Sequence, residues 1–211
     1  MCTQKKLDEL FISWRNAQEV VNHDRNVLNN PAYVFTPDGL IGDEATYEMS
    51  SPKKVLYVLQ ESHLNHAGLR PNTKFESWAK KLDMSNQIMQ RLQGMQEIIM
   101  KSDNVSLKSA AYMNINKNGN RMDNGSSVYW PQFNKYAKLF SQFVKEEIRI
   151  LSPEYIVCCG TYDTVINIIG DEGNNIIIVD MIHPSGVSGK NKICYLQKFR
   201  TRLEEAEKKH L

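Results

Sequence analysis

Four short apolar runs alternate with longer stretches of helical character along this chain. The runs are Val55–Leu59, Ala110–Ile115, Tyr155–Cys159 and Ile176–Met181. A continuous apolar run of about five residues predicts a strand that is buried on both faces of a parallel sheet. Strands that alternate with helices predict a sheet with helices packed on both of its faces. We therefore expect an α/β protein, a three-layer α/β/α sandwich around a four-stranded parallel sheet.

Helices are expected in the stretches between and around these runs. The predicted helices are Leu7–Val21, Met84–Met100, Phe133–Leu151, Thr161–Ile169 and Cys194–Lys208, with Ser85 as the N-cap of the second. The segment Asn22–Ser51 has no periodicity and contains several prolines and glycines, which predicts a long connection over the surface. We find no internal repeat and no domain boundary. The prediction is a single domain over residues 1–211, with the first helix and the connection in 1–52 and the core in 53–211.

The composition is that of an ordinary globular protein. With 211 residues, 41% hydrophobic and 24% charged, the chain can build one full core. A net charge of +2 permits nucleic-acid binding but does not argue for it. No apolar segment approaches the ~20 residues that span a bilayer, and the charged N-terminus lacks a signal-peptide core. Four cysteines without metal-ligand spacing suit a reducing compartment, so we expect a cytoplasmic monomer with no membrane partner.

Polar side chains occupy the carboxyl ends of three predicted strands. Gln60, Glu61, Ser62 and His63 follow the first strand, Asn114 is near the end of the second, and His183, Pro184 and Ser185 follow the fourth. The carboxyl ends of parallel strands meet at one edge of a sheet, so these groups are expected to converge on one crevice. A carboxylate, an amide and an imidazole are the groups that recognise a nucleobase and act on the bond to its sugar.

Each of these residues also has a purely structural interpretation. Glu61 and His63 could simply solvate the junction between strand and loop, and Asn114 could cap the loop that follows it. His183 could satisfy a backbone carbonyl next to Pro184. The sequence pattern leaves these alternatives open.

The ordered set of motifs resembles the uracil-DNA glycosylase superfamily. The stretch Val55–His63, VLYVLQESH, is similar to the first motif of that family, an apolar strand that runs into GQDPYH. AAYMNINK resembles the strand that ends in the base-reading asparagine, and HPSGVS, from His183 to Ser188, resembles the motif HPSPLS. EIRILSPEYIVCCG is similar to the helix–Pro–strand–Gly unit of the family. The resemblance covers roughly Lys53 to Ser188.

The resemblance implies a role for each matching residue. Gln60 matches the glutamine of the first motif, Glu61 the water-activating carboxylate, Asn114 the base-reading amide, His183 the group that stabilises the departing base, and Phe75 the ring that stacks on the base. It further implies contacts with DNA from Ser62, Ser185, Val187 and Ser188, with Val187 in the place of the leucine wedge, and Lys190 belongs to a basic cluster near them. His63 is expected close to the base. The implied reaction uses no metal and no cofactor.

The first motif departs from the family pattern at several positions. Ser62 stands where the family has proline, and His63 replaces the tyrosine that excludes the methyl group of thymine. Glu61 is one methylene longer than the aspartate of the family. A pocket altered in this way could suit a modified or damaged base.

The resemblance implies a DNA glycosylase that excises an altered base and leaves an abasic site, in DNA repair or in defence against modified foreign DNA. Two alternatives stay open: a non-catalytic nucleic-acid-binding member of the fold, and an unrelated α/β enzyme acting on a free nucleoside or nucleotide.

Overall fold

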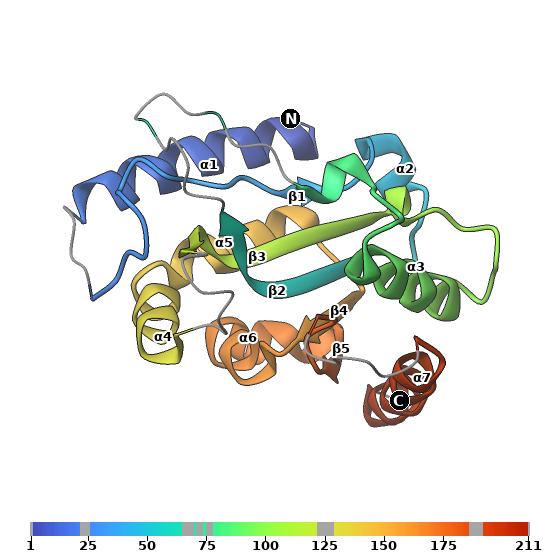
Figure 1. The fold of residues 1–211 in the computed structure, drawn as a ribbon. Coiled ribbons are helices and arrows are strands. Elements are labelled where there is room, and N and C mark those ends of the chain that lie inside the picture. The colour runs from blue at the N-terminus through green and yellow to red at the C-terminus, as the bar shows by residue number, and fades with distance from the viewer. Residues whose placement is uncertain are drawn as a thin grey trace.

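The chain forms one mostly parallel sheet of five strands (Figure 1). The computed structural model describes residues 2–21, 26–64, 70, 74, 78–121, 129–185 and 192–210. Its strands are β1 Gly39–Leu40, β2 Val55–Leu64, β3 Ala110–Arg121, β4 Tyr155–Cys159 and β5 Ile177–Met181. They lie in the order β1-β3-β2-β4-β5. The pairs β3–β2, β2–β4 and β4–β5 are parallel, and the pair β1–β3 is antiparallel. The α/β class is confirmed. The predicted count of four strands is wrong, because the two residues of β1 are too few to give a pattern.

The two central strands are longer than their apolar runs. Strand β2 continues to Leu64 and β3 continues to Arg121, beyond the predicted ends at Leu59 and Ile115. Ladder pairing uses backbone groups, so it can go on after the apolar side chains stop. Leu59 pairs with Asn114 and Glu61 pairs with Asn116, before the register shifts between Glu61 and His63. The polar residues expected in a loop therefore lie on paired strands.

Helices cover both faces of the sheet (Figure 1). The helices are α1 Thr3–Val20, α2 Glu44–Glu48, α3 Gln87–Met100, α4 Trp130–Leu139, α5 Ser141–Leu151, α6 Tyr162–Ile169 and α7 Lys192–His210. Short 3₁₀ turns occupy Trp78–Lys81, Leu107–Ser109 and Gly170–Asn175. Buried side chains of α1, α4, α5 and α6 pack on one face, and those of α3 and α7 pack on the other.

The predicted helices differ from the observed ones at several boundaries, such as the start of α1 at Thr3, and in two further features. The stretch Phe133–Leu151 forms two helices, because the backbone of Phe140 leaves the helical region with φ −103° and ψ 17°. Helix α3 is capped by Asn86, whose Oδ1 accepts a hydrogen bond from the amide of Ile88 at 2.8 Å. Ser85 instead hydrogen-bonds to Asp83, so it belongs to the turn before the helix.

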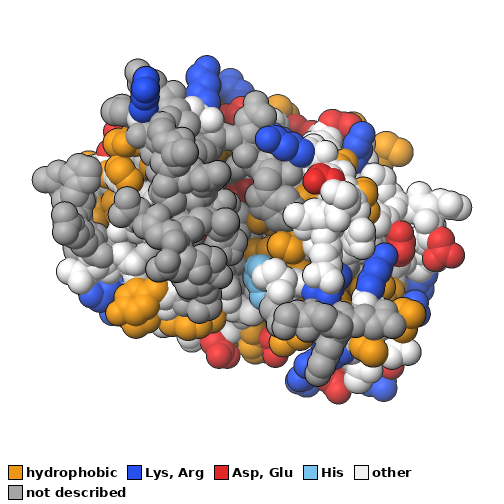
Figure 2. Space-filling view, viewed as in Figure 1, with side chains coloured by type: hydrophobic (Ala, Val, Ile, Leu, Met, Phe, Trp, Pro, Cys, Tyr) orange, Lys and Arg blue, Asp and Glu red, His pale blue; other side chains and the backbone are white. Residues whose placement is uncertain are grey.

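Charged side chains of both signs are interspersed on the face of the molecule seen in Figure 2. Exposed charges of the described residues also form ion pairs, such as Arg149 Nη2 with Glu172 Oε1 at 2.8 Å. None of the helices within the described ranges has the length and apolar character needed to cross a bilayer. The charge on this face does not by itself mark a binding surface, so the site has to be located from the geometry of particular residues.

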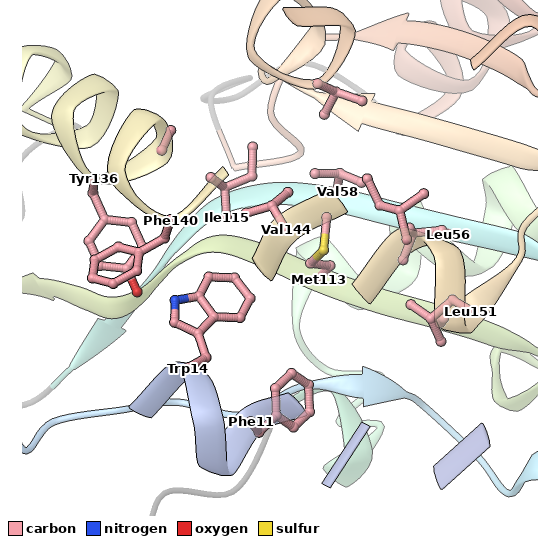
Figure 3. Packing of buried hydrophobic residues seen from close by; sticks show 14 of the residues in the cluster. Phe11, Trp14, Leu56, Val58, Met113, Ile115, Tyr136, Phe140, Val144 and Leu151 are labelled. Carbon is pink, nitrogen blue, oxygen red and sulfur yellow. The ribbon is translucent and has the colours of Figure 1, made fainter. Parts of the chain in front are cut away.

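The segment before β2 is part of the core and not a surface connection. Trp14 of α1 is fully buried and lies 6.0 Å, ring centroid to centroid, from Phe35, a residue of that segment (Figure 3 shows Trp14 among its neighbours in the core). Val34 and Leu40 are buried as well. Residues 26–41 run along the outer edge of β3, where the amide of Thr36 donates to the carbonyl of Lys117 at 2.8 Å. The prediction of a surface connection is therefore wrong.

Candidate functional site

The ends of three parallel strands meet around Gly160. Gln60 of β2 donates a hydrogen bond from Nε2 to the carbonyl oxygen of Gly160 at 3.1 Å. Gly160 follows β4 with φ +73°, and its amide donates to the carbonyl of Met181, the last residue of β5, at 2.6 Å. A Cβ atom at this glycine would lie 3.0 Å from Gln60 Nε2 and 3.6 Å from the amide nitrogen of His183. The fold thus brings Gln60 and the backbone of His183 close to Gly160, where the positive φ favours glycine.

Glu61 is a buried carboxyl group with an asymmetric environment. Its side chain is 6% exposed, and Oε2 accepts hydrogen bonds from Asn116 Nδ2 at 2.7 Å and from Asn29 Nδ2 at 3.2 Å. Oε1 is buried and makes no hydrogen bond with the described residues. Burial raises the pKa of Glu61 to about 7, although the two amides act in the opposite direction. One oxygen is therefore fixed by two amides, while the other has no hydrogen-bond partner among the described residues.

Hydrogen bonds hold Asn114 at both polar atoms of its side chain and at its backbone N–H. Its Nδ2 donates to Ser62 Oγ at 2.9 Å, its Oδ1 accepts from the hydroxyl of Tyr112 at 3.1 Å, and its amide donates to Asp38 Oδ2 at 2.6 Å. The strand register places Asn116 beside Glu61, two residues further along β3. Asn114 and Ser62 are thus brought together, while the amide that reaches Glu61 is that of Asn116.

His183 lies after β5 with its ring orientation set by Ser185. The amide of Ser185 donates to His183 Nδ1 at 3.2 Å, and the Ser185 hydroxyl lies 2.7 Å from the same nitrogen. Because a backbone N–H can only donate, Nδ1 is an acceptor, and the proton of the neutral imidazole is on Nε2. The half-buried ring can therefore donate from Nε2.

Several predicted site residues lie outside the described part of the chain. These are Phe75, Val187, Ser188 and Lys190. His63 belongs to β2, but only its backbone is described. Their expected contacts with the base and with DNA stay predictions.

Four residues that contact the site were missed in the sequence. Asn116 could have been found by extending β3 beyond its apolar run. Asn29 lies in a segment without periodicity and gives no such signal. Arg91 and Tyr195, whose hydrogen bonds go to Pro184 and Ile182, occupy ordinary helical core positions in the sequence.

Two cavities and the possible metal ligands of the described residues were compared with the predicted site. Cavities of 540 Å³ between α4 and α6 and of 470 Å³ between β5 and α7 contain none of the predicted site residues. The described ranges hold no group of three or more His, Cys, Asp or Glu side chains placed to bind a metal ion. Comparison of the sequence with protein-family models and with curated proteins found no match.

Proposed function

We propose that this protein is a DNA glycosylase that hydrolyses the bond between a base and its sugar. The observation that carries the proposal is Glu61, a buried carboxyl with a pKa of about 7 and one oxygen without a hydrogen bond to the described residues. A general base works best when its pKa is near the working pH. The order of the sequence motifs, and the convergence of Gln60 and His183, support the same assignment.

The proposed reaction follows from the two titratable groups. The C–N bond breaks with its electron pair going to the base, while the sugar gains cationic character. Glu61 as carboxylate stabilises this charge and accepts a proton from the water that attacks C1′. His183 donates from Nε2 to the departing base, whose negative charge it stabilises. The products are the free base and an abasic site, and the base must leave the helical stack beforehand.

Base release is the measurement that tests the proposal. Wild-type protein is incubated with a panel of oligonucleotides and with DNA carrying natural base modifications. Released bases are identified by mass, and abasic sites by alkaline strand cleavage. We expect one base to be released, with loss of activity by at least about 100-fold in Glu61→Gln and in His183→Ala.

The matched control is Glu204→Gln, which removes an exposed carboxyl of α7. It should release base at the wild-type rate. No release of any base by the wild type, with DNA binding intact, would exclude a glycosylase and leave a nucleic-acid-binding protein.

The bonds of Asn114 favour a second candidate, a non-catalytic nucleic-acid-binding member of the fold. Ser62 and Tyr112 already use one N–H of Nδ2 and one lone pair of Oδ1, so fewer hydrogen-bonding groups of Asn114 remain for a base. Such a protein would bind DNA without turnover, and Glu61→Gln would leave its affinity unchanged.

Salt dependence separates both of these candidates from an enzyme of free nucleosides or nucleotides. DNA affinity should fall on a log–log plot against salt with a slope of about −0.9 for each phosphate contact. A small ligand would show a much weaker dependence.

A further inference from the structure

A buried arginine holds the backbone of the segment that carries His183. Arg91 of α3 is fully buried, and its Nη1 donates a hydrogen bond to the carbonyl oxygen of Pro184. Removing a guanidinium from water costs much free energy, and an apolar side chain of similar volume would fill the same space at lower cost. The hydrogen bond to Pro184 is one contact that the arginine supplies and an apolar side chain does not.

Tyr195 of α7 holds the same segment from the other side of His183. Its hydroxyl donates to the carbonyl oxygen of Ile182 at 3.0 Å, and its ring is 97% buried. The guanidinium carbon of Arg91 lies 5.1 Å from the centroid of this ring, within the range of a cation–π contact. The carbonyls before and after His183 are therefore each bound by a buried side chain, and these two side chains contact each other.

This arrangement fixes the position of the imidazole. With the backbone held on both sides, the ring of His183 retains only its own side-chain torsions, and Ser185 restricts these through Nδ1. We propose that Arg91 and Tyr195 are positioning residues, which keep His183 Nε2 directed at the departing base. The inference rests on the proposed function for its chemical meaning, but the position of the ring can be measured without any activity.

The first test uses Tyr195→Phe, which removes the hydroxyl and keeps the ring. Tyr155→Phe is the matched control, since Tyr155 is also buried on the face of α3 and α7 but donates to Glu207 at 3.2 Å, away from His183. The ¹⁵N shifts of the His183 ring are recorded at a pH where the ring is neutral, with His183→Ala for assignment. We expect one dominant Nε2–H tautomer in the wild type and in Tyr155→Phe, and a mixture of tautomers in Tyr195→Phe.

Kinetics provide the second test. We expect Tyr195→Phe to lower kcat for base release by about tenfold or more with little change in KM, because small displacements of a reacting group cost large factors in rate. In the His183→Ala background the same change should have no further effect on kcat. Arg91→Met should resemble Tyr195→Phe, and Arg91→Lys, which keeps a donor and the charge, should restore part of the loss.

The outcomes separate the positioning role from the proposed function. Unchanged His183 signals in both Tyr195→Phe and Arg91→Met would overturn the positioning role, as would an equal loss of kcat in the Tyr155→Phe control. The positioning role would also be overturned if Tyr195→Phe lowered kcat in the His183→Ala background by as much as it does in the wild type. If the wild type releases no base, the proposed function fails, and the ring signals alone decide whether Arg91 and Tyr195 position His183.

Discussion

At the scale of single residues, the burial of Glu61 has opposite consequences for stability and for chemistry. Burial raises its pKa to about 7 from the ordinary 4.5, so the folded protein binds a proton there more tightly than the unfolded chain does. Stability from this group is therefore fully present below about pH 4.5 and is lost as the pH rises towards 7. The same shift makes Glu61 a base suited to neutral pH.

Replacing Glu61 by Gln should remove this pH dependence. An ionised carboxyl at this buried position costs on the order of 3 kcal/mol of folding free energy. The free energy of unfolding of the variant should therefore rise relative to that of the wild type as pH rises. Urea denaturation of both proteins at about pH 5 and about pH 8 measures the difference. Glu204→Gln is the control and should follow the wild type. Parallel pH dependences of wild type and Glu61→Gln would mean that Glu61 titrates normally.

At the scale of elements, a buried ionic triad joins the segment before β2, strand β3 and helix α5. Lys117 Nζ binds Asp38, and it lies 2.8 Å from Glu147 Oε2, with all three side chains buried. The ammonium is 5.0 Å from the centroid of Trp14 and 5.4 Å from that of Phe11. Burial, assisted by the charge of Asp38, raises the pKa of Glu147 well above its ordinary value. The buried environment of Glu147 therefore disfavours its ionised form.

The raised pKa of Glu147 predicts unequal effects of substituting Lys117 and Glu147. Lys117→Met should destabilise the protein by about 3–5 kcal/mol, because it leaves a buried carboxylate without its partner. Glu147→Gln removes a carboxyl whose ionised form burial disfavours, and it should cost less, about 1 kcal/mol. Urea denaturation curves of both variants provide the comparison. Equal costs would contradict the unequal roles of Lys117 and Glu147.

Asn118 attaches the segment before β2 to the edge of β3. Its Oδ1 accepts from the amide of Asn30 at 2.7 Å, and its Nδ2 donates to the carbonyls of Pro31 and Val34 at 3.2 and 3.1 Å. Asn29, which precedes Asn30 in that segment, donates a hydrogen bond to Glu61. The same attachment thus stabilises the sheet edge and positions Asn29, which donates a hydrogen bond to Glu61, the proposed general base.

Asn118→Ala should loosen residues 26–41 and reduce base release together. Each buried polar group left without a partner costs about 1–3 kcal/mol, so hydrogen exchange at Asn30 and Val34 should accelerate more than in the centre of the sheet. The control is Asn134→Ala, at an exposed position of α4. Unchanged exchange in residues 26–41 would contradict the role given to Asn118.

The sequence predicts the elements of this fold that have a pattern of their own. Strand β4 begins and ends at the predicted residues, because both of its faces are apolar. Strand β1 and residues 26–41 were missed, since their contacts are backbone pairs and asparagine side chains that leave no periodicity. At the site, Gln60 and His183 could be placed by topology alone. The pairing of Glu61 with Asn29 and Asn116 depends on a register that the sequence does not encode locally.

At the scale of the whole molecule, the first 52 residues supply a large share of one core. Trp14 and Tyr47 are fully buried, and the hydroxyl of Tyr47 donates to the carbonyl of Leu151 at the end of α5 at 3.0 Å. Asp38 belongs to the triad and Asn29 to the candidate site. The two parts predicted as an N-terminal extension and a core therefore share one hydrophobic cluster and one site.

A chain that begins at Lys53 is accordingly expected not to fold by itself. Burial of one large apolar side chain contributes about 1.5–3 kcal/mol, and the removed part holds several, including Leu7, Trp14 and Leu40. Their sum, on the order of 10 kcal/mol, is similar to the whole net stability of about 5–15 kcal/mol. Near-ultraviolet circular dichroism and urea denaturation test this, with removal of the chain from Lys208 onward as control, since residues 208–210 are exposed. A cooperative transition in the chain from Lys53 would mean that the sheet and α3 to α7 suffice for folding, with residues 1–52 needed only to complete the site.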